Sequence, residues 1–132
     1  MPQDDVFAPS WAPRMLSILR IMTALLFLAH GTQKLFGFPA PQYMPAAFTM
    51  GWCAAVIELV GGVLLTLGLF TRAAAFICAG EMAFAYFIAH FPKSFFPAVN
   101  GGDAAVLFCF VFLYLFVAGG GTWSVDAARN RV

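Results

Sequence analysis

The sequence predicts an all-α, membrane-embedded protein, a four-transmembrane-helix bundle made of two helical hairpins. The first reason is composition. Of the 132 residues, 62% are hydrophobic and 10% are charged, whereas soluble domains contain about 45–50% apolar and about 25% charged residues. The second reason is that the apolar residues form four segments, each near the roughly 20 residues that a helix needs to cross a bilayer. Because a helix satisfies its own backbone hydrogen bonds, four spanning helices are the expected arrangement.

We expect one domain over residues 1–132, with an N-terminal tail (1–14) and a C-terminal tail (119–132) around the spans. The fourth span is the shortest. The connections differ: the first is uncharged with three prolines, the second is the tight turn Thr71-Arg72, and the third is aromatic with two prolines. The predicted spans cover residues 15–36, 51–70, 73–91 and 101–118.

The basic residues are divided unequally between the two ends of the predicted helices. Five arginines fall on one side and two lysines on the other. Since connections rich in lysine and arginine stay in the cytoplasm, we expect both termini and the 71–72 turn to be cytoplasmic. The arginines are Arg14, Arg20, Arg72, Arg129 and Arg131, and the lysines are Lys34 and Lys93.

The net charge and the cysteines argue against several classes of function. A formal net charge of +1 provides no electrostatic footprint for nucleic acid. The three cysteines, Cys53, Cys78 and Cys109, are odd in number and form no CxxC motif. This pattern argues against a disulfide framework, a zinc site or a dithiol centre, and no metal site is expected. Cys78 and Cys109 lie in apolar runs and are expected to pack as small hydrophobic residues.

Six ionisable residues lie inside the predicted spans, where they are costly. A charge at mid-membrane costs about 2.5–3.5 kcal/mol on insertion scales. These side chains must therefore face the bundle interior, pair with one another or line a wet cavity. Arg20 and Arg72, at the cytoplasmic ends, are expected to act as topology signals and as partners of helix C-termini or headgroups. The six residues are Arg20, His30, Lys34, Glu58, Glu81 and His90.

The candidate site lies toward the outer ends of the helices. Lys34, reaching down from the first helix, can pair with Glu58 of the second helix, with His30 between them in depth. Glu81 is placed inward. His90 is nine positions from Glu81 and therefore lies on the opposite face of an ideal helix. We expect it at the membrane–water interface and not in the site, at the same depth as His30. Two alternatives stay open: Lys34 can snorkel to the headgroups, and His30 can be a satisfied core residue.

Four stretches of the chain together resemble the DoxX family of small four-helix integral membrane proteins. They carry His-Gly-x-x-Lys, Glu-x-x-Gly-Gly and Asn-Gly-Gly motifs and cover most of the chain. The resemblance implies a helical bundle in the bacterial inner membrane. Some relatives are tied to quinone-linked oxidation of reduced sulfur compounds or to complexes handling oxidative and thiol stress. The stretches are AHGTQKLFG (29–37), ELVGGVLLTLGLFTR (58–72), EMAFAYFIAHFPKSFFPAVNGGDAAVLF (81–108) and GGGTWSVD (119–126).

Three functions are compatible with these residues. The first is a redox-associated membrane subunit, for example of a quinone-linked oxidoreductase, in which His30, Lys34 and Glu58 hold a quinone-like head group. Glu81 joins these three as a candidate catalytic residue, because histidine and lysine donate to a quinone carbonyl and glutamate can relay protons. A membrane or soluble redox partner would then supply electrons. The alternatives are a small-molecule or ion carrier, functioning as a homo-oligomer, and a structural or assembly subunit without activity of its own.

Overall fold

The computed structural model describes residues 9–41 and 43–130, and the regular structure of this part of the chain is entirely helical. The outermost residues of both predicted tails, 1–8 and 131–132, lie outside the described residues. The elements in chain order are α1 (Ala12–Phe36), α2 (Met50–Leu67), α3 (Thr71–Ala85), the π-helical turn η2 (Tyr86–His90), the 3₁₀ turn η3 (Phe91–Lys93), α4 (Pro97–Asn100), α5 (Asp103–Ala118) and α6 (Val125–Arg129).

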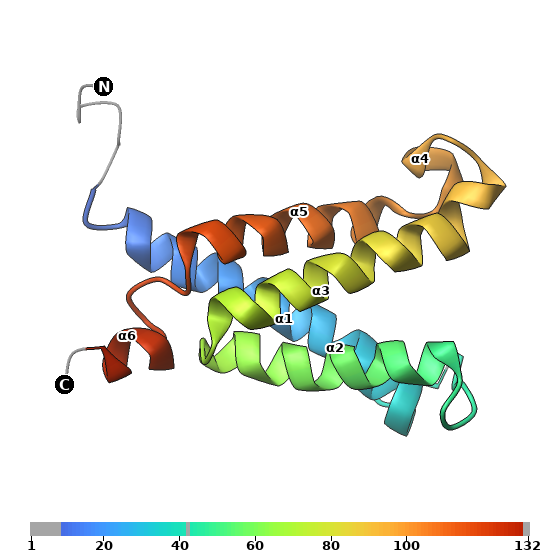
Figure 1. The fold of residues 1–132 in the computed structure, drawn as a ribbon, viewed down its shortest axis with the longest axis horizontal. Helices are drawn as coiled ribbons and strands as arrows, with labels where there is room; N and C mark the ends of the chain where they lie inside the picture. Colours follow the sequence, from blue (N-terminus) through green and yellow to red (C-terminus); the bar gives the residue numbers. More distant parts are fainter. Residues whose placement is uncertain (1–8, 42, 131–132) are drawn as a thin grey trace.

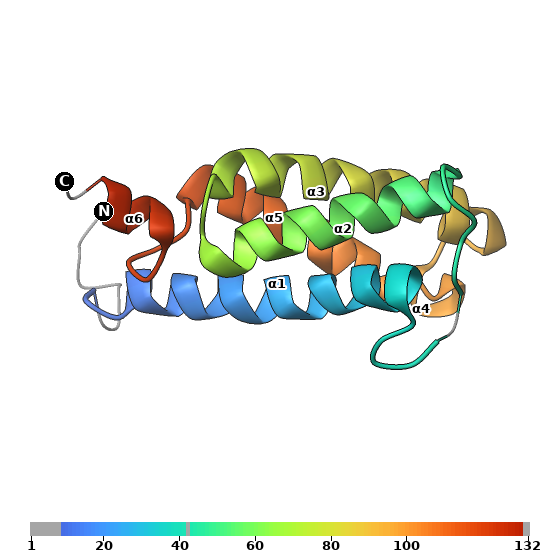
Figure 2. The same cartoon turned by 90° about the horizontal axis from the view of Figure 1, so that it is seen from below.

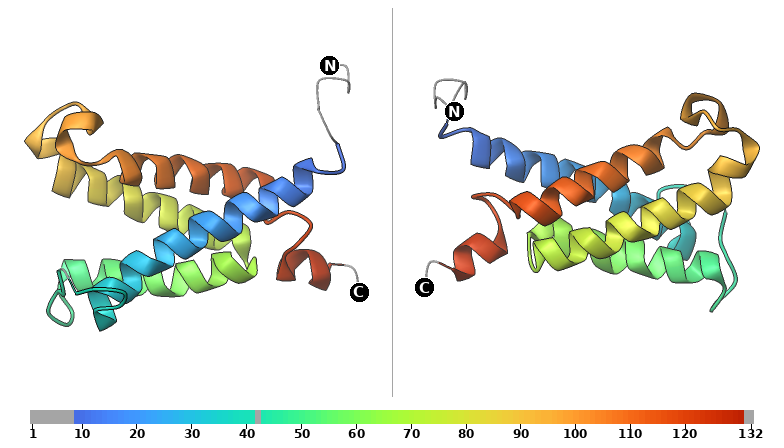
Figure 3. Two further views of the ribbon diagram at one scale, coloured as in Figure 1. Left: turned by 180° about the vertical axis from the view of Figure 1, so that it is seen from behind. Right: turned by 45° about the horizontal axis from the view of Figure 1, so that its top comes forward.

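The long helices form two antiparallel hairpins. Helix α1 packs along α2, and α3 packs along α5 (Figures 1 and 2). The start of α1, the α2–α3 turn and α6 lie at one end, which we call the termini end. The α1–α2 connection and α4 lie at the other end, the loop end. The two hairpins diverge toward the loop end (Figure 3).

Within residues 9–41 and 43–130, three helical segments are long and apolar enough to cross a membrane: Ala12–Phe36, Met50–Leu67 and Thr71–Lys93. Helix α5 is apolar but has only 16 residues, about 24 Å at 1.5 Å per residue, against a hydrocarbon core of about 30 Å. The all-helical membrane fold is therefore confirmed, whereas the fourth crossing stays a prediction.

Glycines in the left-handed conformation end the first two helices. Gly37 (φ 70°) follows α1, and its N–H donates to the carbonyl of Gln33. Gly68 (φ 71°) ends α2 three residues before the boundary expected from hydropathy, because its backbone conformation is one that L side chains adopt poorly. The chain then enters α3 at Thr71. This tight turn sets α2 and α3 antiparallel.

Further glycines let the helices approach one another closely. A Cβ at Gly31 of α1 would lie 2.8 Å from the backbone nitrogen of Leu59, and one at Gly62 would lie 2.9 Å from the Cα of Leu28. On the next helix pair, a Cβ at Gly61 would collide with the Cys78 Sγ. Such contacts between backbones are typical of helices packed in lipid. They bring α1, α2 and α3 together around the middle of α2.

The termini end is held by a buried arginine. Arg20 is 1% exposed and donates from Nε to the Leu65 carbonyl (2.8 Å), from one terminal nitrogen to Gly120, and from the other to Trp123 (2.8 Å). Leu65 lies in the last turn of α2, so the expected role at a helix C-terminus is confirmed for Arg20. It does not face the headgroups, because the 119–123 segment folds over it.

Helix α6 docks on the α2–α3 turn through Asp126. Its two carboxylate oxygens accept from the backbone N–H groups of Phe70 and Thr71, each at 2.9 Å. Burial on its own would raise the pKa of Asp126, but the hydrogen bonds from Thr71 and Phe70, helped by Arg129, outweigh it and hold the pKa below its usual value. Residues 119–130 are thus a folded part of the protein.

Candidate functional site

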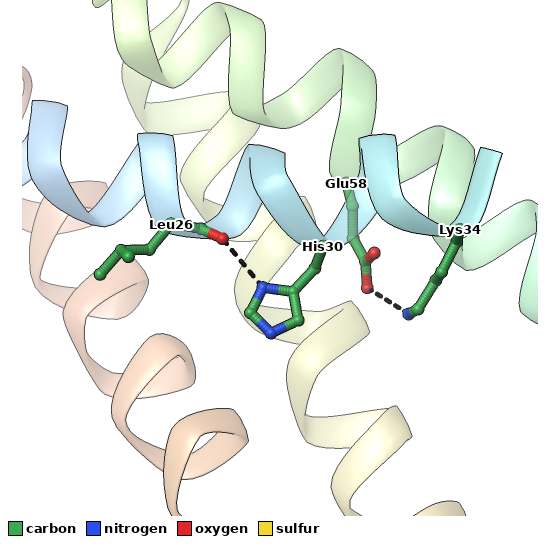
Figure 4. A network of polar contacts seen from close by, with 4 residues as sticks. All are labelled: Leu26, His30, Lys34 and Glu58. Carbon is green, nitrogen blue, oxygen red and sulfur yellow. Dashed lines mark hydrogen bonds and ion pairs between the residues drawn. The ribbon is translucent and has the colours of Figure 1, made fainter. Parts of the chain in front are cut away.

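Lys34 of α1 and Glu58 of α2 form an ion pair inside the helix bundle. The Lys34 Nζ lies 2.9 Å from Glu58 Oε1, and the side chains are 28% and 2% exposed (Figure 4). Glu58 is buried because Gly31 brings α1 against the backbone at Glu58 and Leu59. Lys34 lies one helical turn after Gly31 on the same face of α1, and its flexible side chain reaches back to the carboxylate. The pairing predicted from the cost of a carboxylate in hydrocarbon is confirmed.

His30 lies beside this pair, one turn earlier on α1. Its Nδ1 is 2.8 Å from the carbonyl oxygen of Leu26 (Figure 4). Because a carbonyl only accepts, Nδ1 carries the proton, which leaves Nε2 as the acceptor of the neutral imidazole. The ring packs edge-on against Phe108 of α5, with centroids 5.8 Å apart. The backbone carbonyl and Phe108 together fix the ring.

A cavity of about 330 Å³ joins these residues; we call it the histidine cavity. It lies between α1, α2, α3 with its π turn, and the start of α5. Its size is near the lower end of the range for small-molecule sites. Polar side chains occupy part of its wall and small or aromatic residues the rest. The lining residues are Phe27, His30, Lys34, Glu58, Met82, Ala85, Ala89, His90, Gly101, Ala104, Ala105 and Phe108.

His90 also lines this cavity, which the sequence analysis did not predict. The prediction assumed an ideal helix, but α3 continues into a π turn at Tyr86–His90, closed by the bond from the Phe91 N–H to the Tyr86 carbonyl. A π turn holds an extra residue and rotates the residues after it relative to the residues before it. His90 therefore points toward the start of α5, with Nδ1 3.1 Å from the Asn100 carbonyl. Both histidines line one cavity; the sequence analysis predicted their similar depth but not the shared cavity.

Glu81 lies in a second cavity, of about 550 Å³, between α2 and α3; we call it the α2–α3 cavity. Lys34 lines both cavities, so the ion pair stands between them. Both carboxyl oxygens of Glu81 and the Oε2 of Glu58 are buried and lack a hydrogen-bond partner among the described residues. Besides Lys34 and Glu81, the lining residues are Tyr43, Met50, Gly51, Cys53, Ala54, Ile57, Ile77, Phe84, Ala85, Ile88 and Ala89.

The structure thus gathers the four residues singled out from the sequence around the crossing of α1, α2 and α3. His30, Lys34 and Glu58 line one cavity, and Glu81 lines the other. The sequence analysis did not predict that His90 lines the histidine cavity or that Asn100 holds the neighbouring loop in place. The Asn-Gly-Gly motif was a usable signal: Asn100 Oδ1 accepts from the Gly102 N–H, and Nδ2 donates to the Tyr86 hydroxyl and the Ser94 carbonyl. These bonds hold the loop against the π turn.

Long apolar helices and an internal ion pair beside two histidines define a small multi-pass membrane protein with a polar site between its helices. The chain belongs to the DoxX family, whose sequence model matches residues 15–91. An uncharacterized protein of Haemophilus influenzae is 43% identical over 122 residues, covering 88% of this chain and 91% of that protein. No solved structure matches the chain.

Proposed function

We propose that this protein is a redox-associated subunit of the bacterial inner membrane. In this proposal four helices cross the bilayer, both termini are cytoplasmic, and the loop end faces outward. The histidine cavity takes a quinone-like head group. Three chemical features support this assignment: the cavity lies within an apolar bundle, its wall holds hydrogen-bond donors, and a carboxylate oxygen in that wall has no partner among the described residues.

The observation that carries the proposal is the set of side chains in the histidine cavity. A quinone has two carbonyl oxygens that need donors, and its reduction consumes protons. Lys34 Nζ is a donor held at the wall, and each imidazole donates or accepts at Nε2 according to its protonation. Glu58 Oε2, buried without a partner among the described residues, suits a hydroxyl donor. The residues therefore fit a quinone head group, which would supply the two-electron chemistry, while the protein binds, orients and moves protons.

The electrons must come from another protein in this proposal. The sequence has no CxxC motif and no flavin fingerprint, so this chain offers no evident electron carrier of its own. A membrane or soluble redox partner is therefore part of the proposal, and homo-oligomerisation stays open. Both are tested by identifying what purifies with the chain in stoichiometric amounts.

Binding of a short-chain benzoquinone to the protein in lipid nanodiscs tests the proposal. We expect saturable binding by calorimetry, reduced at least tenfold by Lys34→Gln and by His30→Ala. Lys93→Gln is the matched control, because Lys93 is exposed at the loop end and lines neither cavity. Absence of saturable binding to the parent, or equal binding by Lys34→Gln and Lys93→Gln, would refute the quinone site.

A structural role is the second candidate, and one observation favours it. The Lys34–Glu58 pair lies at the glycine contact between α1 and α2, where it fixes which helices pair. Under this alternative, Glu58→Gln and Lys34→Gln change stability and partner assembly but bind quinone no differently from the parent. The calorimetric comparison therefore separates the two roles.

A further inference from the structure

Two glutamates face each other across helices α2 and α3. Gly61 of α2 lies against Cys78 of α3, and the two helices run antiparallel (Figure 1). Both helices rise equally per residue, so moving three residues back from Gly61 on α2 and three residues forward from Cys78 on α3 leads to the same height along the helix pair. The residues at that height are Glu58 and Glu81. The electrostatic interaction between the two side chains agrees with this register.

The charges around this pair do not balance if both carboxyls are ionised. Lys34 is bonded to Glu58 Oε1, which accounts for one negative charge. The remaining three oxygens, Glu58 Oε2 and both oxygens of Glu81, are buried without a partner among the described residues. An uncompensated carboxylate between helices in a membrane is strongly disfavoured. One proton on the pair removes the excess charge and supplies the missing hydrogen-bond donor.

Other ionisable groups nearby do not change this balance. Cys78 lies one turn before Glu81 on the same helix, buried in the core. The residues of α5 that line the histidine cavity are apolar. Among the described residues that line either cavity, the basic side chains are Lys34 and the two histidines; Lys34 is the one bonded to a glutamate, whereas each histidine Nδ1 is bonded to a backbone carbonyl. The remaining titratable groups of the cavity walls are Tyr43 and Cys53.

We propose that Glu58 and Glu81 hold one proton between them and pass it between the two cavities. With the proton on Glu81, its O–H donates to Glu58 Oε2 while Glu58 Oε1 accepts from Lys34. Transfer converts Glu81–COOH and Glu58–COO⁻ into Glu81–COO⁻ and Glu58–COOH, so atoms and charge balance. Glu81 lines the α2–α3 cavity and Glu58 the histidine cavity. The transfer therefore carries a proton from one cavity wall to the other, whichever molecule the cavities bind.

Infrared spectroscopy of the full chain in lipid nanodiscs at pH 7 tests the shared proton. A protonated carboxyl absorbs above the amide I band and shifts when water is exchanged for D₂O. The chain has six acidic residues; Glu58, Glu81 and Asp103 fall in the predicted spans, and of these three Asp103 is exposed at the start of α5. We expect one such absorption in the parent. Glu81→Gln and Glu58→Gln should each abolish it, because the remaining carboxylate then neutralises Lys34.

Two further variants make the test quantitative. Lys34→Met removes the cation, so both carboxyls should be protonated and the absorption should about double. Asp103→Asn should leave it unchanged, because Asp103 is exposed at the start of α5. Circular dichroism confirms that each variant is folded. A parent spectrum without a protonated carboxyl overturns the proposal whatever the variants do, as does an absorption that persists in both glutamine variants. Neither outcome bears on quinone binding, which the calorimetry tests separately.

Discussion

Replacing Glu58 by leucine should destabilise the protein through Lys34 rather than through packing. Breaking a buried ion pair costs about 3–5 kcal/mol, because the surviving charge is left without a partner. Two effects lower this cost: the Lys34 side chain is 28% exposed, so part of the ammonium's hydration can be recovered, and Glu81, which lines the same cavity as Lys34, can ionise and partly compensate the ammonium. We therefore expect a loss near the lower end, about 3 kcal/mol. The double variant Glu58→Leu/Lys34→Met should recover to within about 1 kcal/mol of the parent, because an apolar pair replaces an ionic one.

Reversible unfolding in SDS, followed by circular dichroism and extrapolated to zero denaturant, measures these differences. Glu58→Gln serves as the isosteric comparison, since its amide oxygen can still accept from Lys34 Nζ. It should lose less stability than the leucine variant. Equal destabilisation of the leucine variant and the double variant would refute the role of Lys34, since the loss would then come from packing around α2. A leucine variant as stable as the parent would refute it as well.

Three further predictions concern packing and the termini end. Gly31→Ala should lower the free energy of unfolding by about 1–3 kcal/mol in the same assay, because its Cβ would lie 2.8 Å from a backbone nitrogen. Gly80→Ala is the control and should not lower it, because a Cβ at Gly80 would meet no atom within 4 Å. Arg20→Gln should speed hydrogen exchange in α6, because the Trp123 carbonyl loses its donor and the Gly120 carbonyl keeps only the Ser17 hydroxyl; unchanged exchange would contradict this role. Folding lowers the pKa of Asp126. The ionised carboxylate therefore contributes its full stabilisation above the unfolded pKa of about 3.9, and this contribution is lost as the pH falls through the lower folded pKa. In Asp126→Asn, the free energy of unfolding should depend less on pH in that acidic range and be unchanged in its pH dependence elsewhere.

The Lys34–Glu58 pair could be predicted from sequence because the physical constraint is strong. A glutamate in the middle of an apolar run is too short to reach water, so it needs a donor from another helix. The predicted helix boundaries and antiparallel hairpin left Lys34 as the donor at a reachable depth. The end of α1 was also predictable, because Gly37 follows the apolar run and glycine ends helices readily. The end of α2 was placed three residues too late, because Leu69 and Phe70 continue the apolar run beyond Gly68.

The position of His90 could not be predicted because it depends on a local departure from α-helical geometry. The sequence YFIAH has no proline or glycine that would mark a π turn. Contacts made after folding hold this turn: His90 with Asn100, and Asn100 with Tyr86 and Ser94. Helix periodicity separated His90 from Glu81, and the two residues do line different cavities, but it did not predict that His90 shares a cavity with His30. The docking of α6 was missed for a related reason, since Asp126 meets Phe70 and Thr71 only through a contact distant in sequence.

Close packing and buried charge are coupled at the crossing of α1 and α2. Gly31 has no side chain to separate the two backbones, so the packed helices exclude bulk solvent from the Glu58 side chain, which is 2% exposed. The same exclusion that makes an ionised Glu58 costly strengthens its attraction to Lys34, because a charge interaction grows as the effective dielectric constant falls. Gly31 and Lys34 are one turn apart on one face of α1, so one helix supplies both the close contact and the compensating charge. A site of this kind keeps its charge balance only while the helices stay packed, and any ligand or proton that changes the charge of Glu58 must therefore also change how firmly α1 and α2 hold together.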